Sequence, residues 1–413
     1  MRSLSRKICS GLAIALVPAL IAACGDGGSS ESQTTVGGAP VSIGVIGAYS
    51  GFAASTSGGG AKAASAWAES VNASGGLAGR PVKLIIKDVG SAATSGGIMA
   101  AKELINQDHV LAIIDQDVQD SKWVKIAEEA KVPVIAATTG QGSLISANTF
   151  PVIPSTIALG YGIFASAKQL GSTFGFIYAS EVASAINMDM YKGFAKAAGV
   201  SMPVVIAVSA ASPDYTAVCQ QLIDAKVDSY EVGGAAAMVE KVAQQCHQQG
   251  LKAPLVLPGA GFAEHWLTEP AFNNAMVEDI VPSASNAILP AQKEYRQALE
   301  KYESDFVGQP TDNSFAETGW TSGKMIEVGV GKIEGELTPA KLQSALHTVK
   351  DETLDGLVHP TTYKAGQITT NPCWFNWKIV DGKAVPVNDS KPVCAPTEVI
   401  QPVIEKLQKA LGG

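Results

Sequence analysis

Histidine, cysteine and the short motifs of catalysis are scarce in this sequence. Its 413 residues include five histidines, scattered without ligand spacing, and six cysteines without a Cys-x-x-Cys pair. A G-x-S-x-G elbow, a phosphate-binding P-loop and an HExxH helix are missing, and no G-x-G-x-x-G followed by an acid comes after the first expected strand. These absences predict a protein that is not an enzyme and that holds no metal or cofactor.

Long apolar runs and positive charge are also scarce. Beyond residue 24, no run is long and uncharged enough to predict a membrane span. Acidic residues outnumber basic ones, 38 to 30, and the formal net charge of −8 argues against a nucleic-acid partner. The chain is longer than one hydrophobic core usually serves, so we expect two lobes.

Residues 1–23 have the pattern of a signal peptide, with a basic start followed by a short apolar stretch. The sequence Ile21-Ala22-Ala23-Cys24 resembles a bacterial lipobox, which implies that Cys24 carries lipid and anchors the chain to a membrane. A secretory signal with a chance cysteine is the alternative. Residues 24–39, rich in Gly, Ser and Thr, predict a flexible tether. Removal of residues 1–23, which hold three basic residues and no acidic one, would change the net charge from −8 to −11.

Residues 41–88 predict a strand, a loop, a helix and a second strand. Apolar β-branched residues dominate 41–46, turn residues follow at 48–52, apolar residues recur at helical spacing over 64–71, and strand alternation resumes over 82–86. The same alternation of strand and helix continues along the chain, which predicts an α/β fold with mainly parallel sheets covered on both faces. In such folds ligands bind at loops that follow the carboxyl ends of strands.

Three stretches resemble the leucine/isoleucine/valine-binding branch of the type I periplasmic binding proteins. They are the loop Gly47-Ala48-Tyr49-Ser50-Gly51, the segment VNASGGLAGRPVKL at 71–84, and Lys131-Val132-Pro133-Val134-Ile135. The resemblance in element order extends from about residue 41 to about residue 390. It implies two Rossmann-like lobes, joined by three hinge crossovers and closing on a small ligand, which is delivered to ABC permease subunits.

The order of the expected elements sets the lobe boundaries. Residues 40–155 and 283–353 are expected to form the first lobe, and residues 156–282 and 354–396 the second. Residues 397–413 carry an apolar stripe that predicts a terminal helix packed on the body. We expect a monomer, lipid-anchored on the outer face of the cytoplasmic membrane or periplasmic. A lipoprotein that senses its ligand and reports to a membrane receptor, without transport, remains the alternative.

The resemblance implies ligand contacts in loops that follow strands. A ligand carboxylate suits backbone N–H groups and hydroxyls near helix N-termini, and the hydroxyls of Ser50, Thr138 and Thr139 could supply them. Hydroxyls at such places also serve as turns and helix caps, and both interpretations stay open. The implied contacts of the first lobe are Tyr49, Ser50, Gly51, Phe52, Gln119, Asp120, Ser121, Thr138 and Thr139.

In the second lobe the resemblance is incomplete. The amino-acid binders of the family hold the ligand's ammonium group with a tyrosine after a Gly-Gly pair and an acid in a Pro-Glu-Gly turn. This chain has Ala235 and Ala260 at those positions, and Ser184 stands where a tyrosine-glycine pair is usual. A desolvated ammonium without a partner costs several kcal/mol, against about 8 kcal/mol for a whole micromolar complex.

We therefore expect a ligand other than a branched-chain amino acid. A carboxylate without an amine, a neutral amide, or an aromatic or hydroxylated acid suits a site that lacks this tyrosine and this acid better. Aromatic residues that are expected near loop ends and could line the cleft are Tyr49, Phe52, Trp123, Phe262 and Trp266. For each of them taken singly, packing in the core is the more usual role.

Four cysteines follow Cys24, and an even count in an exported protein favours disulfides. Cys219 and Cys246 are expected on the helices before and after one strand, which makes them neighbours on one face of a right-handed βαβ unit. Cys373 and Cys394 flank an expected hairpin whose turn is Asp381-Gly382. The predicted pairs are Cys219 with Cys246 and Cys373 with Cys394.

Overall fold

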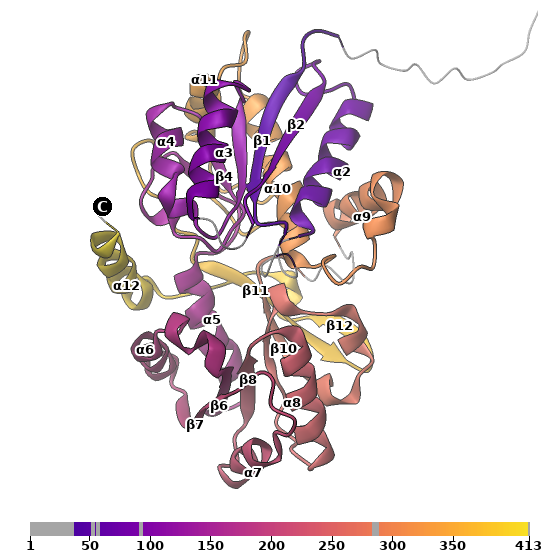
Figure 1. Cartoon of the computed structure of the whole chain (residues 1–413), viewed down its shortest axis with the longest axis vertical. Helices are drawn as coiled ribbons and strands as arrows, with labels where there is room; N and C mark the ends of the chain where they lie inside the picture. The colour runs from indigo at the N-terminus through magenta and orange to yellow at the C-terminus, as the bar shows by residue number, and fades with distance from the viewer. Residues whose placement is uncertain (1–36, 51–53, 55–57, 91–93, 283–288, 412–413) are drawn as a thin grey trace, which may run out of the picture. The chain divides into compact units, whose positions relative to one another are not determined.

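The computed structural model describes residues 37–411 except 51–53, 55–57, 91–93 and 283–288. The expected signal peptide, Cys24 and nearly all of the tether lie outside the described residues, as do Gly51 and Phe52. The described chain is an α/β fold of mainly parallel sheets flanked by helices, as the alternation of strand and helix predicts (Figure 1).

The first sheet contains five parallel strands in the order β2-β1-β3-β4-β5. Val41 pairs with Val82, and Ile43 pairs with Ala112, so the carboxyl ends of the strands lie along one edge of the sheet. The strands are β1 (Val41–Gly47), β2 (Val82–Asp88), β3 (Ala112–Gln116), β4 (Val134–Ala136) and β5 (Thr149–Pro151).

Helices cover both faces of this sheet because successive strand residues point to opposite sides. Ile114 belongs to the buried cluster of α2 and α10, whereas its neighbour Ile113 belongs to the cluster of α3 and α4. The helices packed with this sheet are α2 (Gly60–Ala73), α3 (Thr94–Asn106), α4 (Val124–Glu129), α9 (Pro290–Tyr302), α10 (Ser314–Val330) and α11 (Pro339–Leu346).

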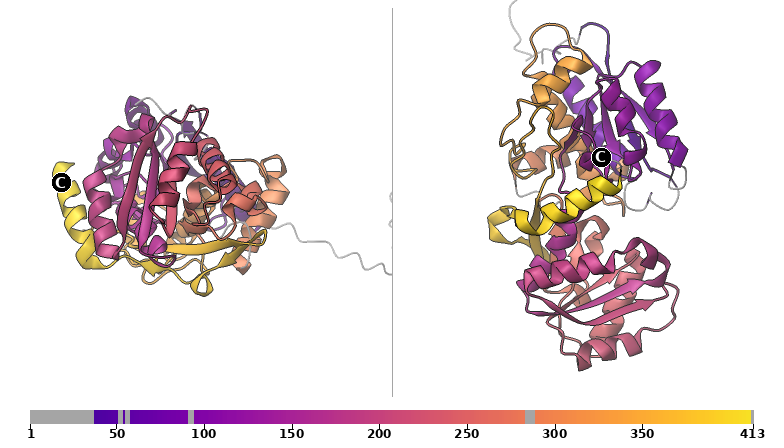
Figure 2. Two further views of the ribbon diagram at one scale, coloured as in Figure 1. Left: turned by 90° about the horizontal axis from the view of Figure 1, so that it is seen from below. Right: turned by 90° about the vertical axis from the view of Figure 1, so that its left-hand side faces the viewer.

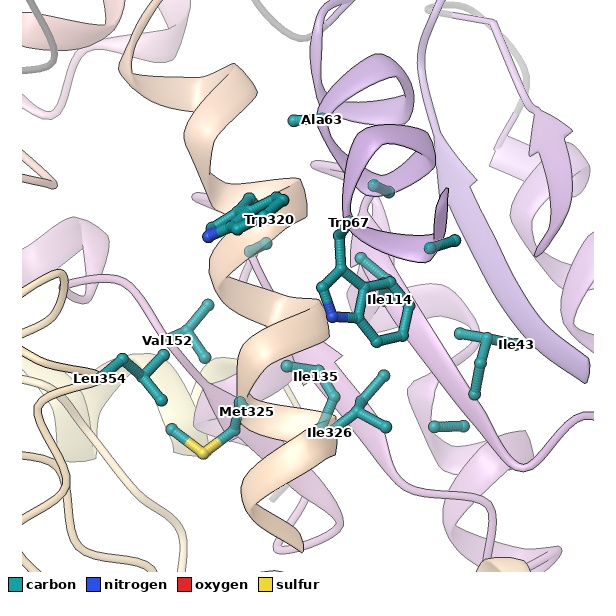
Figure 3. Packing of buried hydrophobic residues seen from close by; sticks show 14 of the residues in the cluster. Ile43, Ala63, Trp67, Ile114, Ile135, Val152, Trp320, Met325, Ile326 and Leu354 are labelled. Carbon is teal, nitrogen blue, oxygen red and sulfur yellow. The ribbon is translucent and has the colours of Figure 1, made fainter. Parts of the chain in front are cut away.

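Two glycines allow α2 and α10 to pack closely. A Cβ atom at Gly319 would overlap the carbonyl oxygen of Gly60, and one at Gly323 would overlap the ring of Trp67. Trp67 fills the space between the helices, among the core residues shown in Figure 3. Its indole N–H donates to Glu327 at 2.8 Å. This packing fixes the amino end of α10, which contributes to the site described below.

The second sheet continues the parallel pattern and ends in an antiparallel hairpin. Strands β7-β6-β8 are parallel, a bridge between Tyr230 and Leu255 connects β8 to β9, β10 runs parallel to β9, and β11 is antiparallel to β10 and β12. The strands are β6 (Thr173–Ala179), β7 (Ser201–Val208), β8 (Ser229–Gly233), β9 (Val256–Pro258), β10 (Met276–Asp279), β11 (Cys373–Val380), β12 (Lys383–Pro386) and β13 (Val393–Cys394).

Both predicted disulfides are confirmed. Cys219 on α7 binds Cys246 on α8, with the two Cα atoms 4.9 Å apart, and Cys373 on β11 pairs directly opposite Cys394 on β13. The helices packed with the second sheet are α5 (Thr156–Lys168), α6 (Met188–Ala198), α7 (Thr216–Asp224) and α8 (Ala236–Gln248).

The described chain passes three times between the cores of the two sheets, and the last passage comes later than the expected boundary at residue 354. Leu354, Leu357 and Tyr363 pack in the core of the first sheet, and the hydroxyl of Tyr363 donates to the carbonyl of Pro151 at 2.9 Å. These contacts hold residues 354–363 against the first sheet. We therefore propose that the third crossover comes after Tyr363. The other proposed boundaries of the two lobes stay as stated above.

The C-terminal region contains the hairpin and the terminal helix that the sequence predicts. Asp381 and Gly382 both have positive φ, 49° and 78°, as the two-residue turn requires. The helix α12 (Thr397–Ala410) buries Ile400 and Ile404 and packs on α5 (Figure 2), and its Gln408 donates to the carbonyl of Leu144 at 2.9 Å. Among the described helices, none is both long and apolar enough to cross a bilayer.

Candidate functional site

A pocket of about 200 Å³ is lined by residues that pack with both sheets. The second sheet contributes Asp279 at the end of β10, Trp377 on β11 and residues 262–265, which follow β9. Elements packed with the first sheet contribute Arg296 on α9 and residues 308–310 and 312–314, which lead into α10. Because the lining combines strand ends and loops of the second sheet with elements that pack on the first sheet, this pocket is the candidate ligand site.

Aromatic rings form one wall of the pocket. Phe262, a ligand contact expected from the sequence, packs edge to face on Trp377, with ring centroids 4.8 Å apart and an interplanar angle of 85°. A second edge-to-face contact, at 6.0 Å, joins Phe262 to Trp266. Rings that hold one another in this way offer a rigid apolar surface to a planar ligand.

An acidic residue, Asp279, lies beneath the turn in which Ala260 replaces the acid of the family's amino-acid binders. The turn is η4 (Gly259–Gly261), and a Cβ atom at Gly259 would overlap the carboxyl group of Asp279. The Oδ2 atom of Asp279 accepts from the indole N–H of Trp377 and from the hydroxyl of Ser314, each at 2.9 Å, and Oδ1 accepts from the N–H of Ile280 at 2.8 Å. Burial raises the pKa of Asp279, which the three donors oppose.

A buried ion pair forms the other side. Arg296 donates through Nη1 to both carboxylate oxygens of Asp312, at 2.7 and 2.8 Å, and the N–H of Gly308 donates to the same carboxylate at 2.9 Å. The side chain of Asp312 is 3% exposed and that of Arg296 is 22% exposed. The negative charge of Asp312 is therefore paired within the protein, while part of the Arg296 side chain stays accessible.

The first loop of the first sheet is fixed by a chain of hydrogen bonds. The hydroxyl of Tyr49 donates to the amide oxygen of Gln116 at 2.6 Å, and the amide nitrogen of Gln116 donates to Thr318 on α10 at 3.1 Å. Ser50 is exposed, and its side chain binds Asp88, which also accepts from the N–H of Tyr49. Tyr49 and Ser50 are thus held at the carboxyl end of β1 but do not line the pocket.

The next two loops of the first sheet divide the remaining candidates between surface and interior. Gln119 is exposed and Ser121 is half-buried, but Asp120 is fully buried. The hydroxyl of Thr138 accepts from the N–H of Gly140 at 3.2 Å, which supports the turn interpretation for this residue. Thr139 is half-buried, and its carbonyl accepts from Thr156 at 2.6 Å.

The other candidates of the second sheet lie in loops after its strands. Ser184 is in η3 (Ser180–Ala185), Ala235 precedes α8 and is exposed, and Ala260 is in η4. Two of the aromatic residues that could have lined the cleft are core residues, which is the more usual role of a single aromatic side chain. Trp123 and Trp266 are buried, and their indole N–H groups donate to acids, the buried Asp117 at 3.0 Å and the half-buried Glu240 at 3.3 Å.

The sequence did not indicate Asp279, Arg296, Asp312 or Trp377 as site residues. The Asp-Asn-Ser sequence at 312–314 was the available signal, because Asn313 caps α10 through its side chain and so marks a helix N-terminus. Among the described residues, no group of three or more His, Cys, Asp or Glu side chains could hold a metal ion.

The fold and the pocket define a two-sheet ligand-binding protein, and the sequence identifies the family. The periplasmic binding protein family model matches residues 40–383, so the chain belongs to that family, whose members bind ligands outside the cytoplasm and are not enzymes. No curated protein matches the chain by sequence.

Solved structures with the same fold include three solute-binding proteins. One is a leucine-binding protein of Thermotoga maritima, with 15% identity, a TM-score of 0.65, and coverage of 87% of this chain and 99% of that one. A solute-binding protein of R. palustris in complex with benzoate has 16% identity, a TM-score of 0.65, and coverage of 86% and 98%. A fatty acid ABC transporter substrate-binding protein of Thermomonospora curvata has 20% identity, a TM-score of 0.65, and coverage of 88% and 94%. At these identities the likeness concerns the fold alone.

Proposed function

We propose that this protein is the extracytoplasmic substrate-binding lipoprotein of an ABC importer, which captures a small organic ligand by closure of two lobes. Family membership over residues 40–383 supports the binding role. The names of similar structures, which include transporter proteins for leucine and fatty acid, support the transport setting. The observation that carries the proposal is the pocket whose lining comes from elements of both sheets.

The acids of the pocket favour a ligand without an ammonium group. Asp279 accepts three hydrogen bonds from protein donors, and Asp312 is bound by Arg296 and Gly308. Glu264, the other acid of the lining, is exposed. A ligand ammonium would therefore be desolvated without a buried partner of its own, which costs several kcal/mol.

Two features of the lining suit a carboxylate or an amide on a planar body. Arg296 binds Asp312 through one nitrogen, Nη1, which leaves its other guanidinium nitrogens as candidate donors to a ligand oxygen. The rings of Phe262 and Trp377 provide an apolar wall beside it. Aromatic acids combine both requirements, and the R. palustris relative was solved with benzoate.

A thermal-shift screen of the mature protein tests this proposal. The panel contains amino acids, short amides, dicarboxylates and aromatic acids. A ligand at a hundredfold excess over its dissociation constant stabilises the folded protein by about 2.7 kcal/mol, so a true ligand raises the melting temperature clearly. We expect hits among acids or amides and none among leucine, isoleucine and valine. Strong shifts from those three amino acids would reject the proposed ligand class but not the fold.

A further inference from the structure

Asp120 was expected to touch the ligand, but its carboxyl group faces the interior. Its Oδ1 atom accepts from the N–H of Gly142 at 2.8 Å, and Oδ1 of the neighbouring Asp115, on β3, accepts from the N–H of Asp117 at 2.9 Å. Both side chains are 0% exposed. The other oxygen of each carboxyl group, Oδ2, is buried without a hydrogen bond to any donor in the described residues.

The two carboxyl groups lie within hydrogen-bonding reach of each other. If both were ionised, two negative charges would be buried together, and neither Oδ2 would have a donor. One proton between them removes one charge and supplies a strong, charge-assisted hydrogen bond. Burial raises the pKa of Asp115 well above its usual range, with Asp120 and Asp117 adding to the effect, and burial raises the pKa of Asp120 to about 7.

Among the residues that the structure describes, no lysine or arginine is buried, so no buried side chain of this kind can neutralise the pair. On its own loop, Asp117 accepts from Gln119 and Trp123, and Lys122 is exposed. Residues 137–146 have no ionisable side chain. Charged or titratable groups of the adjoining elements are Tyr49 and Asp88 at the ends of β1 and β2, the pair Lys125 with Glu128 and the exposed Glu129 on α4, Lys102 and Glu103 on α3, and the buried Glu317 on α10.

The pair connects two loops at the carboxyl edge of the first sheet. The carboxyl group of Asp120 belongs to the loop after β3 but fills the space at Gly140 and Gly142, after β4, where a Cβ atom at either glycine would contact it. The same loops carry Ser121 and Thr139, which are candidate ligand contacts. The position of Asp120 therefore determines how the two loops sit against each other.

We propose that Asp115 and Asp120 are positioning residues that share one proton, and that this proton holds the loops after β3 and β4 in the arrangement that binds the ligand. Loss of the proton places two negative charges in a buried site and drives the carboxyl group of Asp120 away from Asp115, out of its position at Gly140 and Gly142. Ligand affinity then falls as the pH rises. This last step rests on the proposed function, but the shared proton does not.

The shared proton can be tested without a ligand, by urea unfolding at several pH values between 4.5 and 8. The wild type, Asp120→Asn and the control Asp224→Asn, which changes an exposed acid on α7, are compared. The folded wild type holds the proton more tightly than the unfolded chain, and this difference stabilises the fold. The stabilisation is complete below the usual Asp pKa of about 4 and is lost as the pH rises through about 7. The amide of Asp120→Asn mimics the protonated form.

We expect the unfolding constant of the wild type to rise relative to Asp120→Asn by about tenfold per pH unit between pH 5 and 6.5, and to level off above about 7. Glu231, Glu278 and Glu317 are also buried with raised pKa values, and their effect cancels in the comparison because all variants share them. Asp224→Asn should follow the wild type.

If the ratio of the unfolding constants of the wild type and Asp120→Asn does not change with pH, the shared proton is overturned. If Asp120→Asn does not fold, Asp115→Asn must show the same pH-dependent ratio. A hit from the thermal-shift screen then tests the link to binding, because its affinity should fall between pH 5.5 and 8 for the wild type and stay constant for Asp120→Asn. An empty screen contradicts the proposed function and leaves the unfolding result valid.

Discussion

A single methyl group at Gly259 should disrupt the candidate pocket, whereas the same change two residues later should not. In Gly259→Ala the new Cβ atom overlaps the carboxyl group of Asp279, which Trp377, Ser314 and Ile280 hold in place. At Gly261, no atom lies within 4 Å of the new Cβ position. The two glycines belong to the same short turn, so Gly261→Ala is a matched control.

The expected magnitude follows from the bonds of Asp279. Overpacking costs about 1–3 kcal/mol, and one lost hydrogen bond to a charged group costs about 1.5–3 kcal/mol, so Gly259→Ala should lose about 2.5–6 kcal/mol of stability. Gly261→Ala should change stability by less than about 1 kcal/mol. Urea unfolding followed by tryptophan fluorescence measures both values. A Gly259→Ala protein as stable as Gly261→Ala would refute the placement of Asp279 beneath the turn.

Three further predictions concern the disulfide, the first-sheet loops and the anchor. Replacing Cys219 and Cys246 together by alanine should lower the free energy of unfolding by about 3.5 kcal/mol, since the bridge closes a loop of 27 residues, and thermal unfolding that shows no loss contradicts the entropic account. Thr139→Ala, which removes a hydroxyl, and Tyr49→Ala, which removes a ring held by Gln116, should each weaken binding of the screen's best ligand in calorimetry. Unchanged affinity in both variants excludes these loops from the site. Cys24→Ser should release the protein from the membrane fraction, and a variant that remains there on immunoblotting would exclude the lipid anchor.

Features set by short stretches of sequence could be predicted well. The hairpin turn at Asp381-Gly382 follows from two residues that tolerate positive φ, and the pairing of Cys219 with Cys246 follows from the alternation of helix and strand around them. Element order placed the loops of the first sheet because parallel strands bring their carboxyl ends to one edge. Each inference needs only local spacing and the handedness of a crossover.

The pocket itself could not be predicted because its members are distant in sequence. Asp279, Arg296 and Trp377 meet only after the chain has passed twice more between the two cores, and no local pattern distinguishes them from surface residues. The positions of Trp123 and Trp266 depend on distant contacts in the same way. Their acid partners, Asp117 and Glu240, come from contacts that spacing does not show.

The place of the third crossover, which the sequence puts near residues 354–360, also depends on a long-range contact. The predicted crossover came where a helix ended, but Leu354 and Tyr363 continue to pack on the first sheet. The hydrogen bond from Tyr363 to Pro151 joins residues that are 212 positions apart. Such a contact depends on the assembled core and cannot be inferred from the residues around position 354.

The central claim is that a small ligand binds between the two sheets, and a crystal structure of the protein with the best ligand of the screen tests it most directly. We expect the ligand beside Phe262 and Trp377, with an oxygen near Arg296, and in contact with at least one loop that follows a strand of the first sheet. A ligand bound away from this pocket, or one that contacts elements of a single sheet only, would contradict the claim.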